Sequence, residues 1–94
     1  MSNPNWRIWK YPVPIDDYLE VEIPFAGRIL CVQIQHRPLG IETPCIWVWV
    51  DTKADKETRK FRWFGTGHPG VEGNYIGSVQ MHGGDLVFHL FEVT

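Results

Sequence analysis

Apolar and polar side chains alternate along several short stretches of the chain, a pattern typical of β-strands with one covered face. The clearest stretch is residues 28–36, where Leu30, Val32 and Ile34 share one face. Residues 45–50 are apolar on both faces, which favours a central strand covered on both sides. The same reasoning predicts further strands at residues 6–11, 18–23, 61–64, 75–80 and 86–92.

Proline and glycine separate these stretches, and no window shows sustained helical periodicity. Residues 37–44 are predicted to form a loop. Residues 51–60 carry charges of both signs and almost no apolar side chains, so we expect a solvated loop or a single helical turn there. The pattern predicts an all-β fold, either an antiparallel β-sandwich or a small barrel of about seven short strands. Residues 1–94 are expected to form one domain.

Composition is compatible with a folded core. Apolar residues make up 44% of the chain and aromatic residues 14%. Each large ring can bury roughly 150–250 Å² of surface, which helps so short a chain to form a core without a metal or a disulfide. Cys31 and Cys45 lie inside apolar runs, and we expect both to be buried residues with free thiols.

The charge pattern limits the classes of partner. The formal net charge is −2, with no basic excess, so binding to nucleic acid is unlikely on this ground. The first residues show no basic region followed by an apolar one, and no apolar run approaches the ~20 residues of a membrane helix. We expect neither secretion nor membrane insertion, and a location in the cytoplasm.

Residues 65–70, Gly-Thr-Gly-His-Pro-Gly, form the most unusual local sequence. Such a segment is most often a turn between two strands. It is also a candidate ligand-contacting loop, because glycines allow close backbone approach and successive amides can cradle an anion. It lacks the lysine and following helix of a P-loop, and it is not followed by the helix of a dinucleotide-binding fingerprint.

Candidate chemistry is sparse elsewhere. The spacings of His36, His68, His82 and His89 match no zinc template, although His68 and His82 occupy turns that could meet in space. Ser78 falls within a predicted strand, as do both cysteines, so no exposed nucleophile is evident. We therefore expect no bound metal, no cofactor and no enzymatic activity.

The aromatic residues give the best indication of function. Five tryptophans are difficult to bury in so small a core, and Trp47 and Trp49 share one face of their predicted strand. An exposed aromatic patch indicates association with a partner or a second copy. The candidate binding residues lie in and around the glycine-rich segment: Arg62, Trp63, Thr66, His68, Tyr75 and His82.

Several short motifs occur in order along nearly the whole chain: Trp-Lys-Tyr-Pro at residues 9–12, Ile-Leu-Cys-Val-Gln-Ile-Gln at 29–35, Thr-Pro-Cys-Ile-Trp at 43–47, Phe-Arg-Trp-Phe-Gly-Thr-Gly-His-Pro at 61–69, Tyr-Ile-Gly-Ser-Val-Gln at 75–80 and Leu-Val-Phe-His-Leu-Phe-Glu at 86–92. Together they resemble a family of small proteins of unknown function encoded by bacteriophages and prophages. The resemblance implies a phage product acting in the cytoplasm of a bacterial host. It implies no reaction and hence no catalytic residues.

Three functional hypotheses follow. The first is a phage-encoded protein that binds a host protein and inhibits or redirects a host system, such as CRISPR or another antiphage defence. The second is a small-molecule or nucleotide-binding module that uses residues 65–70, with His68 and His82. The third is an accessory virion or assembly protein that forms homo-oligomers through its aromatic face.

Overall fold

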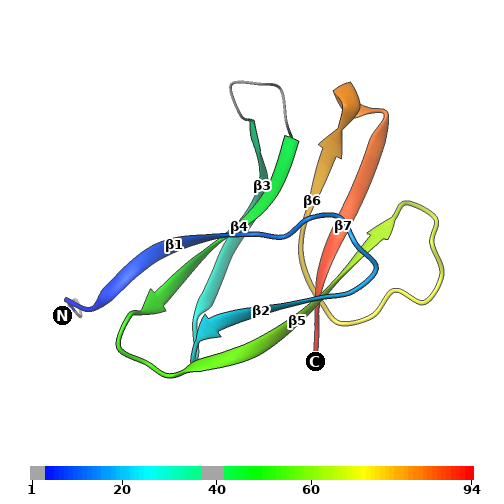
Figure 1. Cartoon of the computed structure of the whole chain (residues 1–94). Helices are drawn as coiled ribbons and strands as arrows, with labels where there is room; N and C mark the ends of the chain where they lie inside the picture. Colours follow the sequence, from blue (N-terminus) through cyan, green and yellow to red (C-terminus); the bar gives the residue numbers. More distant parts are fainter. Residues whose placement is uncertain (1–3, 37–41) are drawn as a thin grey trace.

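The computed structural model describes residues 4–36 and 42–94, and its regular structure is almost entirely β (Figure 1). Seven strands form two antiparallel sheets, with the strand order β1-β4-β3 in one and β2-β5-β7-β6 in the other. A single turn of 3₁₀-helix, η1 (His82–Gly84), joins β6 to β7. The strands are β1 (Trp6–Pro12), β2 (Leu19–Pro24), β3 (Arg28–His36), β4 (Glu42–Asp51), β5 (Lys56–Gly65), β6 (Asn74–Met81) and β7 (Leu86–Val93).

The two sheets pack face to face as a sandwich, which confirms the predicted all-β class and excludes a closed barrel for the described residues. The core lies between the sheets and is built from inward-facing side chains of both: Val13, Ile23, Val32, Ile46, Val48, Val50, Phe61, Trp63, Val79 and Leu90. Aromatic and branched side chains suit this position because they fill the space between two pleated surfaces.

The sheets approach most closely where β3 lies against β6, beside β4 and β7 (Figure 1). Gly77 makes this approach possible, because a Cβ atom added to it would lie 2.7 Å from Cγ1 of Val32. The register of β6 also shifts between Tyr75 and Gly77, where it pairs with β7. A glycine beside a bulge is a common device for close contact between backbones and neighbouring side chains.

The prediction for residues 51–60 was wrong. Only residues 52–55 form the turn, and β5 already begins at Lys56. The sequence pattern did not indicate this part of the strand because residues 56–60 are polar on both of its faces. Lys56, Thr58 and Lys60 face solvent, whereas Glu57 and Arg59 point into the open end of the sandwich.

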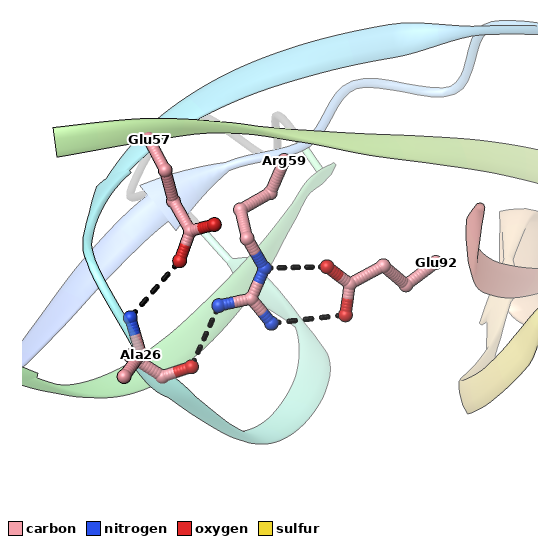
Figure 2. A network of polar contacts seen from close by, with 5 residues as sticks. Ala26, Glu57, Arg59 and Glu92 are labelled. Carbon is pink, nitrogen blue, oxygen red and sulfur yellow. Dashed lines mark hydrogen bonds and ion pairs between the residues drawn. The ribbon is translucent and has the colours of Figure 1, made fainter. Parts of the chain in front are cut away.

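The inward charges of β5 are satisfied by polar partners, as Figure 2 shows. The Arg59 guanidinium forms a two-pronged ion pair with the Glu92 carboxylate, with an Nη2–Oε1 distance of 2.9 Å, and it donates to the Gly27 carbonyl at 2.7 Å. Hydrogen bonding to Glu92 raises the pKa of Arg59. The Ala26 amide donates to the Glu57 carboxylate at 2.9 Å. Alternation of apolar residues does not reveal a strand whose inward residues are charged.

The other expected boundaries differ from the observed ones by only a few residues. β4 begins at Glu42 and so takes in the last part of the predicted loop 37–44, while residues 37–41 lie outside the described part of the chain. β4 is the central strand of its sheet, as predicted. It is not covered on both faces, however, since Trp49 is 44% exposed. Both cysteines are free; Cys45 is buried and Cys31 is half-buried.

Candidate functional site

The segment that follows β5 folds against the outer face of the four-stranded sheet. Phe64 lies opposite His89 on β7, and His89 lies opposite Ser78 on β6, so their side chains form a row on one face. Trp63 and Leu90 face the core, so this row faces outward. Phe64 is nevertheless only 3% exposed. The outer face of this sheet therefore carries a second buried apolar group, separate from the core.

Three aromatic rings form the floor of this region. Phe64 and Phe91 meet edge to face, with centroids 5.6 Å apart and planes at 86°. Tyr75 packs against Phe91 with centroids 5.4 Å apart. These separations and angles fall within the favourable range for aromatic pairs. The Arg62 guanidinium lies 4.9 Å from the Phe64 centroid, and its Nε donates to the Asp17 carbonyl at 3.2 Å.

A chain of polar groups runs beside the rings. The Tyr75 hydroxyl and the Ser78 hydroxyl are 2.6 Å apart, and Ser78 Oγ lies 2.6 Å from Nδ1 of His89. On the other side of the imidazole, Nε2 lies 2.9 Å from the Thr66 hydroxyl. Both ring nitrogens of His89 therefore contact hydroxyl groups. In this arrangement the chain ties β6, β7 and the loop after β5 together.

His68 closes the turn that begins the loop. Its amide donates to the Gly65 carbonyl at 3.1 Å, and the Gly65 amide donates to its Nδ1 at 3.1 Å. A Cβ atom at Gly65 would lie 3.0 Å from the His68 ring, so glycine allows the imidazole to fold over the backbone. The two hydrogen bonds between Gly65 and His68 fix the imidazole at the start of the loop.

The loop and the sheet border an open hollow of about 210 Å³. Its lining combines the aromatic floor with the loop and with His89: Phe64, Gly65, Thr66, Gly67, His68, Val71, Tyr75, His89 and Phe91. Ligand pockets for drug-sized molecules are usually larger, about 300–1,000 Å³. The hollow thus suits a small ring or one part of a larger ligand.

The structure gathers most of the predicted binding residues around this hollow. Thr66, His68 and Tyr75 line it, and Arg62 lies outside the lining, with its guanidinium over the Phe64 ring. Trp63 does not belong there: it is 4% exposed, and its indole N–H donates to the Val13 carbonyl at 3.0 Å. The alternation of a strand explains this, because the neighbours of an outward Arg62 must point inward.

His82 is also placed elsewhere. It begins η1 and does not line the hollow, and its amide donates to the Glu42 carboxylate at 3.0 Å. No hydrogen bond joins His82 to His68 among the described residues. In the same part of the chain, no group of three or more His, Cys, Asp or Glu side chains is arranged to hold a metal ion.

Sequence reasoning missed Phe64, Ser78, His89 and Phe91 as members of the site. The signal was present in β7, because a period of two places His89 and Phe91 on the face opposite to Leu90. The run reads as a core strand because apolar residues occupy both faces. Only the pairing of β5, β6 and β7 shows that the second face carries a separate cluster.

A second surface lies on the outer side of the three-stranded sheet, and we call it the aromatic face: Trp6, Ile8, Leu30, Trp47 and Trp49. The ring centroids of Trp6 and Trp49 are 4.8 Å apart. Trp49 lies between Ile8 on β1 and Arg28 on β3, with Trp47 further along the same side of β4. Ile8 is 59% exposed and Leu30 is 45% exposed. Three of the five tryptophans therefore lie together on this face.

Comparison with known proteins gives a family and no activity. A family model described as Domain of unknown function (DUF7352) matches residues 4–94. The chain belongs to the DUF7352 family. This agrees with the expected membership of a family of unknown function, although the DUF7352 description names neither a phage nor a reaction. No curated protein and no solved structure matches this DUF7352 chain at a significant level. Within residues 4–36 and 42–94, no helix is long and apolar enough to cross a bilayer.

Proposed function

We propose that this chain is a protein-binding module that contacts a host protein through the aromatic face. The observation that carries the proposal is the gathering of large exposed side chains on one side of the three-stranded sheet, where no other element of the described chain covers them. Exposed aromatic clusters of this kind are typical of interfaces, where tryptophan contributes a large share of the binding energy.

Charged side chains border the aromatic face. Lys10 and Arg28 lie on the same side of the sheet, opposite Trp47 and Trp49 in the strand register. The Lys10 ammonium donates to the Gln35 side chain at 2.6 Å, which holds it beside the face. An apolar centre with a polar, partly cationic rim is the usual anatomy of an interface. It favours a partner with an apolar patch flanked by carboxylates.

Strand β1 extends this surface to the edge of the sheet. β1 pairs only with β4 among the described strands, so its other side carries unpaired backbone groups. Ile8 and Trp9 lie on opposite faces of β1, and both side chains are exposed. Arg7, Lys10 and Pro12 discourage indiscriminate pairing of such an edge. A partner is therefore expected to contact the aromatic face with side chains and to lie along β1.

In biological terms we propose a phage-encoded protein that acts in the cytoplasm of a bacterial host and inhibits or redirects a host system, such as CRISPR or another antiphage defence. Binding alone suffices for such inhibition, and no enzymatic activity is required. The geometry of His89 is compatible with binding alone, because its ring nitrogens contact two hydroxyls and, within the described residues, no carboxylate is seen to orient it as in a catalytic triad.

The test is affinity purification from bacterial host cells followed by native mass spectrometry, with two matched variants. Ile8→Ser combined with Trp49→Ser removes the centre of the aromatic face. Phe25→Ser removes a ring that is more exposed than either of these side chains, from the turn between β2 and β3. The proposal expects a host polypeptide bound to the wild type and the Phe25 variant and lost from the double variant. Equal capture by all three proteins would contradict it.

The same measurement distinguishes the structural alternative. If the aromatic face joins two copies of this chain, the wild type will be a homo-oligomer and the double variant a monomer, with no host protein bound. That result would replace the inhibitor hypothesis with an assembly or virion protein, and its presence in purified particles would then be tested.

A further inference from the structure

We propose that the hollow beneath the loop of residues 66–73 binds a small, uncharged, planar heteroaromatic ring. The aromatic floor, the Thr66 hydroxyl and the surrounding carboxylates meet at this one place. The site lies on the four-stranded sheet and is independent of the aromatic face on the other sheet.

The floor favours a planar ring. Phe64 and Phe91 already stand nearly perpendicular to each other, and Tyr75 is tilted against Phe91 at 58°. A further ring can pack against these edges and faces in the offset or edge-to-face geometries that aromatic groups prefer. Tyr75 is 59% exposed and Val71 is 47% exposed, so both still have apolar surface to bury when a ligand enters.

The size of the hollow sets the size of the ligand. A dry cavity of about 150 Å³ is known to hold benzene. The present hollow, at about 210 Å³, therefore accommodates one ring or two fused rings. A whole dinucleotide is too large for this hollow. A single base fits if the rest of the molecule stays in solvent.

The loop supplies a hydrogen-bonding group. The amides of Gly65 and His68 are both paired within the turn, so they are not available to a ligand. The Thr66 hydroxyl lines the hollow, and Nε2 of His89 lies 2.9 Å from it. A hydroxyl can both donate and accept, so it can contact a polar ring atom of a ligand while it contacts His89. A ring nitrogen or a carbonyl oxygen on the ligand complements this hydroxyl.

The charges around the hollow select against an anion. Asp16 and Asp17 line an adjoining depression that shares Gly65 and His68 with the hollow, and Asp85 lines another that shares Thr66. The guanidinium of Arg62 is engaged by the Asp17 carbonyl and the Phe64 ring. A phosphate or carboxylate at the mouth would meet acidic side chains, so a free base or nucleoside-like ring is favoured over a nucleotide.

The experiment is calorimetric titration of the whole chain with benzimidazole, at a mildly alkaline pH where this probe is uncharged. Benzimidazole has two fused rings and one acceptor nitrogen, and indole has the same shape without that nitrogen. We expect benzimidazole to bind with a Kd on the order of 0.1–1 mM, as suits so small a ligand. Indole is expected to bind about three- to tenfold more weakly because the Thr66 hydroxyl then lacks an acceptor on the ligand. Benzimidazole-5-carboxylate is expected to be weaker than benzimidazole.

Substitutions in the hollow test whether benzimidazole binds there. Val71→Asp places a charge on an exposed wall of the hollow and should weaken benzimidazole binding at least tenfold without disturbing the core. Tyr75→Ala should weaken it to a similar extent. Tyr18→Ala is the matched control, because Tyr18 is a similarly exposed tyrosine that hydrogen-bonds Glu20 outside the hollow. The proposal is overturned if benzimidazole shows no saturable binding. It is also overturned if the Val71→Asp variant binds benzimidazole as tightly as the wild type and the Tyr18→Ala control do.

Discussion

At the scale of single residues, the most informative side chain is Tyr11. It packs against the core from β1, and its hydroxyl is buried with no hydrogen-bond partner in the described part of the chain. Burying a hydroxyl without a partner costs roughly 1–3 kcal/mol. Burial also raises the pKa of Tyr11, because the charged phenolate is disfavoured away from water.

Replacing Tyr11 by phenylalanine is therefore expected to stabilise the protein by about 1 kcal/mol. Urea unfolding should show a higher midpoint with an unchanged slope. In the wild type the raised folded-state pKa contributes stability that is complete below the unfolded value of 10.0 and is lost as the pH rises through the folded value. Tyr11→Phe should lose less stability than the wild type over that alkaline range. A destabilised variant would show that the hydroxyl has a partner.

Gly73 occupies a position that only glycine fits without strain. Its φ is +104°, and an added Cβ would lie 2.4 Å from the Glu92 carbonyl oxygen. Gly73→Ala is expected to destabilise the protein by roughly 2–3 kcal/mol, from backbone strain and the steric clash together. Gly70 is the matched control, with φ +74° and open space around its Cβ position, so Gly70→Ala should cost only about 1 kcal/mol. Equal effects on the unfolding free energy would refute the steric contribution.

At the scale of elements, alternation predicted the strands that have one apolar face and failed where a strand carries charges on both. The strands around Val32 and Leu90 were found because their inward residues are apolar, although Leu30, at a register shift in β3, is 45% exposed and does not belong to the core face. β5 was found only from residue 61 onward, since Glu57 and Arg59 occupy inward positions. Their partners, Ala26 and Glu92, lie far away in sequence, and no local pattern reveals such pairs.

The ion pair between Arg59 and Glu92 is expected to matter to the sandwich. The two side chains are 16% and 17% exposed, so removing one leaves the other charge largely out of water. Glu92→Gln should destabilise the protein by about 1–3 kcal/mol, less than for a fully buried pair because solvent still screens it. Glu20→Gln, at an exposed site on β2, should change stability by no more than about 0.5 kcal/mol. Denaturant unfolding of both variants distinguishes the two sites.

The candidate site shows the same division between local and long-range information. The glycine-rich segment and its neighbours Arg62, Thr66, His68 and Tyr75 were identified from the sequence, because glycine and ring residues stand out locally. His89 was not, since only strand pairing brings it to Ser78 and Thr66. Trp63 was misplaced because a cluster of adjacent aromatic residues gives no indication of which ring faces the core.

At the scale of the whole molecule, the two sheets differ in how far their outer faces are covered. The four-stranded sheet covers part of its outer face with its own loop, which buries Phe64. The three-stranded sheet leaves Trp49, Ile8 and Leu30 exposed. A small domain gains stability from burying such side chains, and their exposure on this sheet is the reason for proposing a partner there.

The measurement that tests this account most directly is site-specific photo-crosslinking in host cells, with a photoreactive amino acid placed at position 8 on the aromatic face or at position 25 on the β2–β3 turn. Both native residues are exposed, so either replacement leaves the core intact. The account predicts a cross-link to one host polypeptide from position 8 and none from position 25. Cross-linking from neither position, or equally from both, would contradict the claim that the aromatic face binds a host protein.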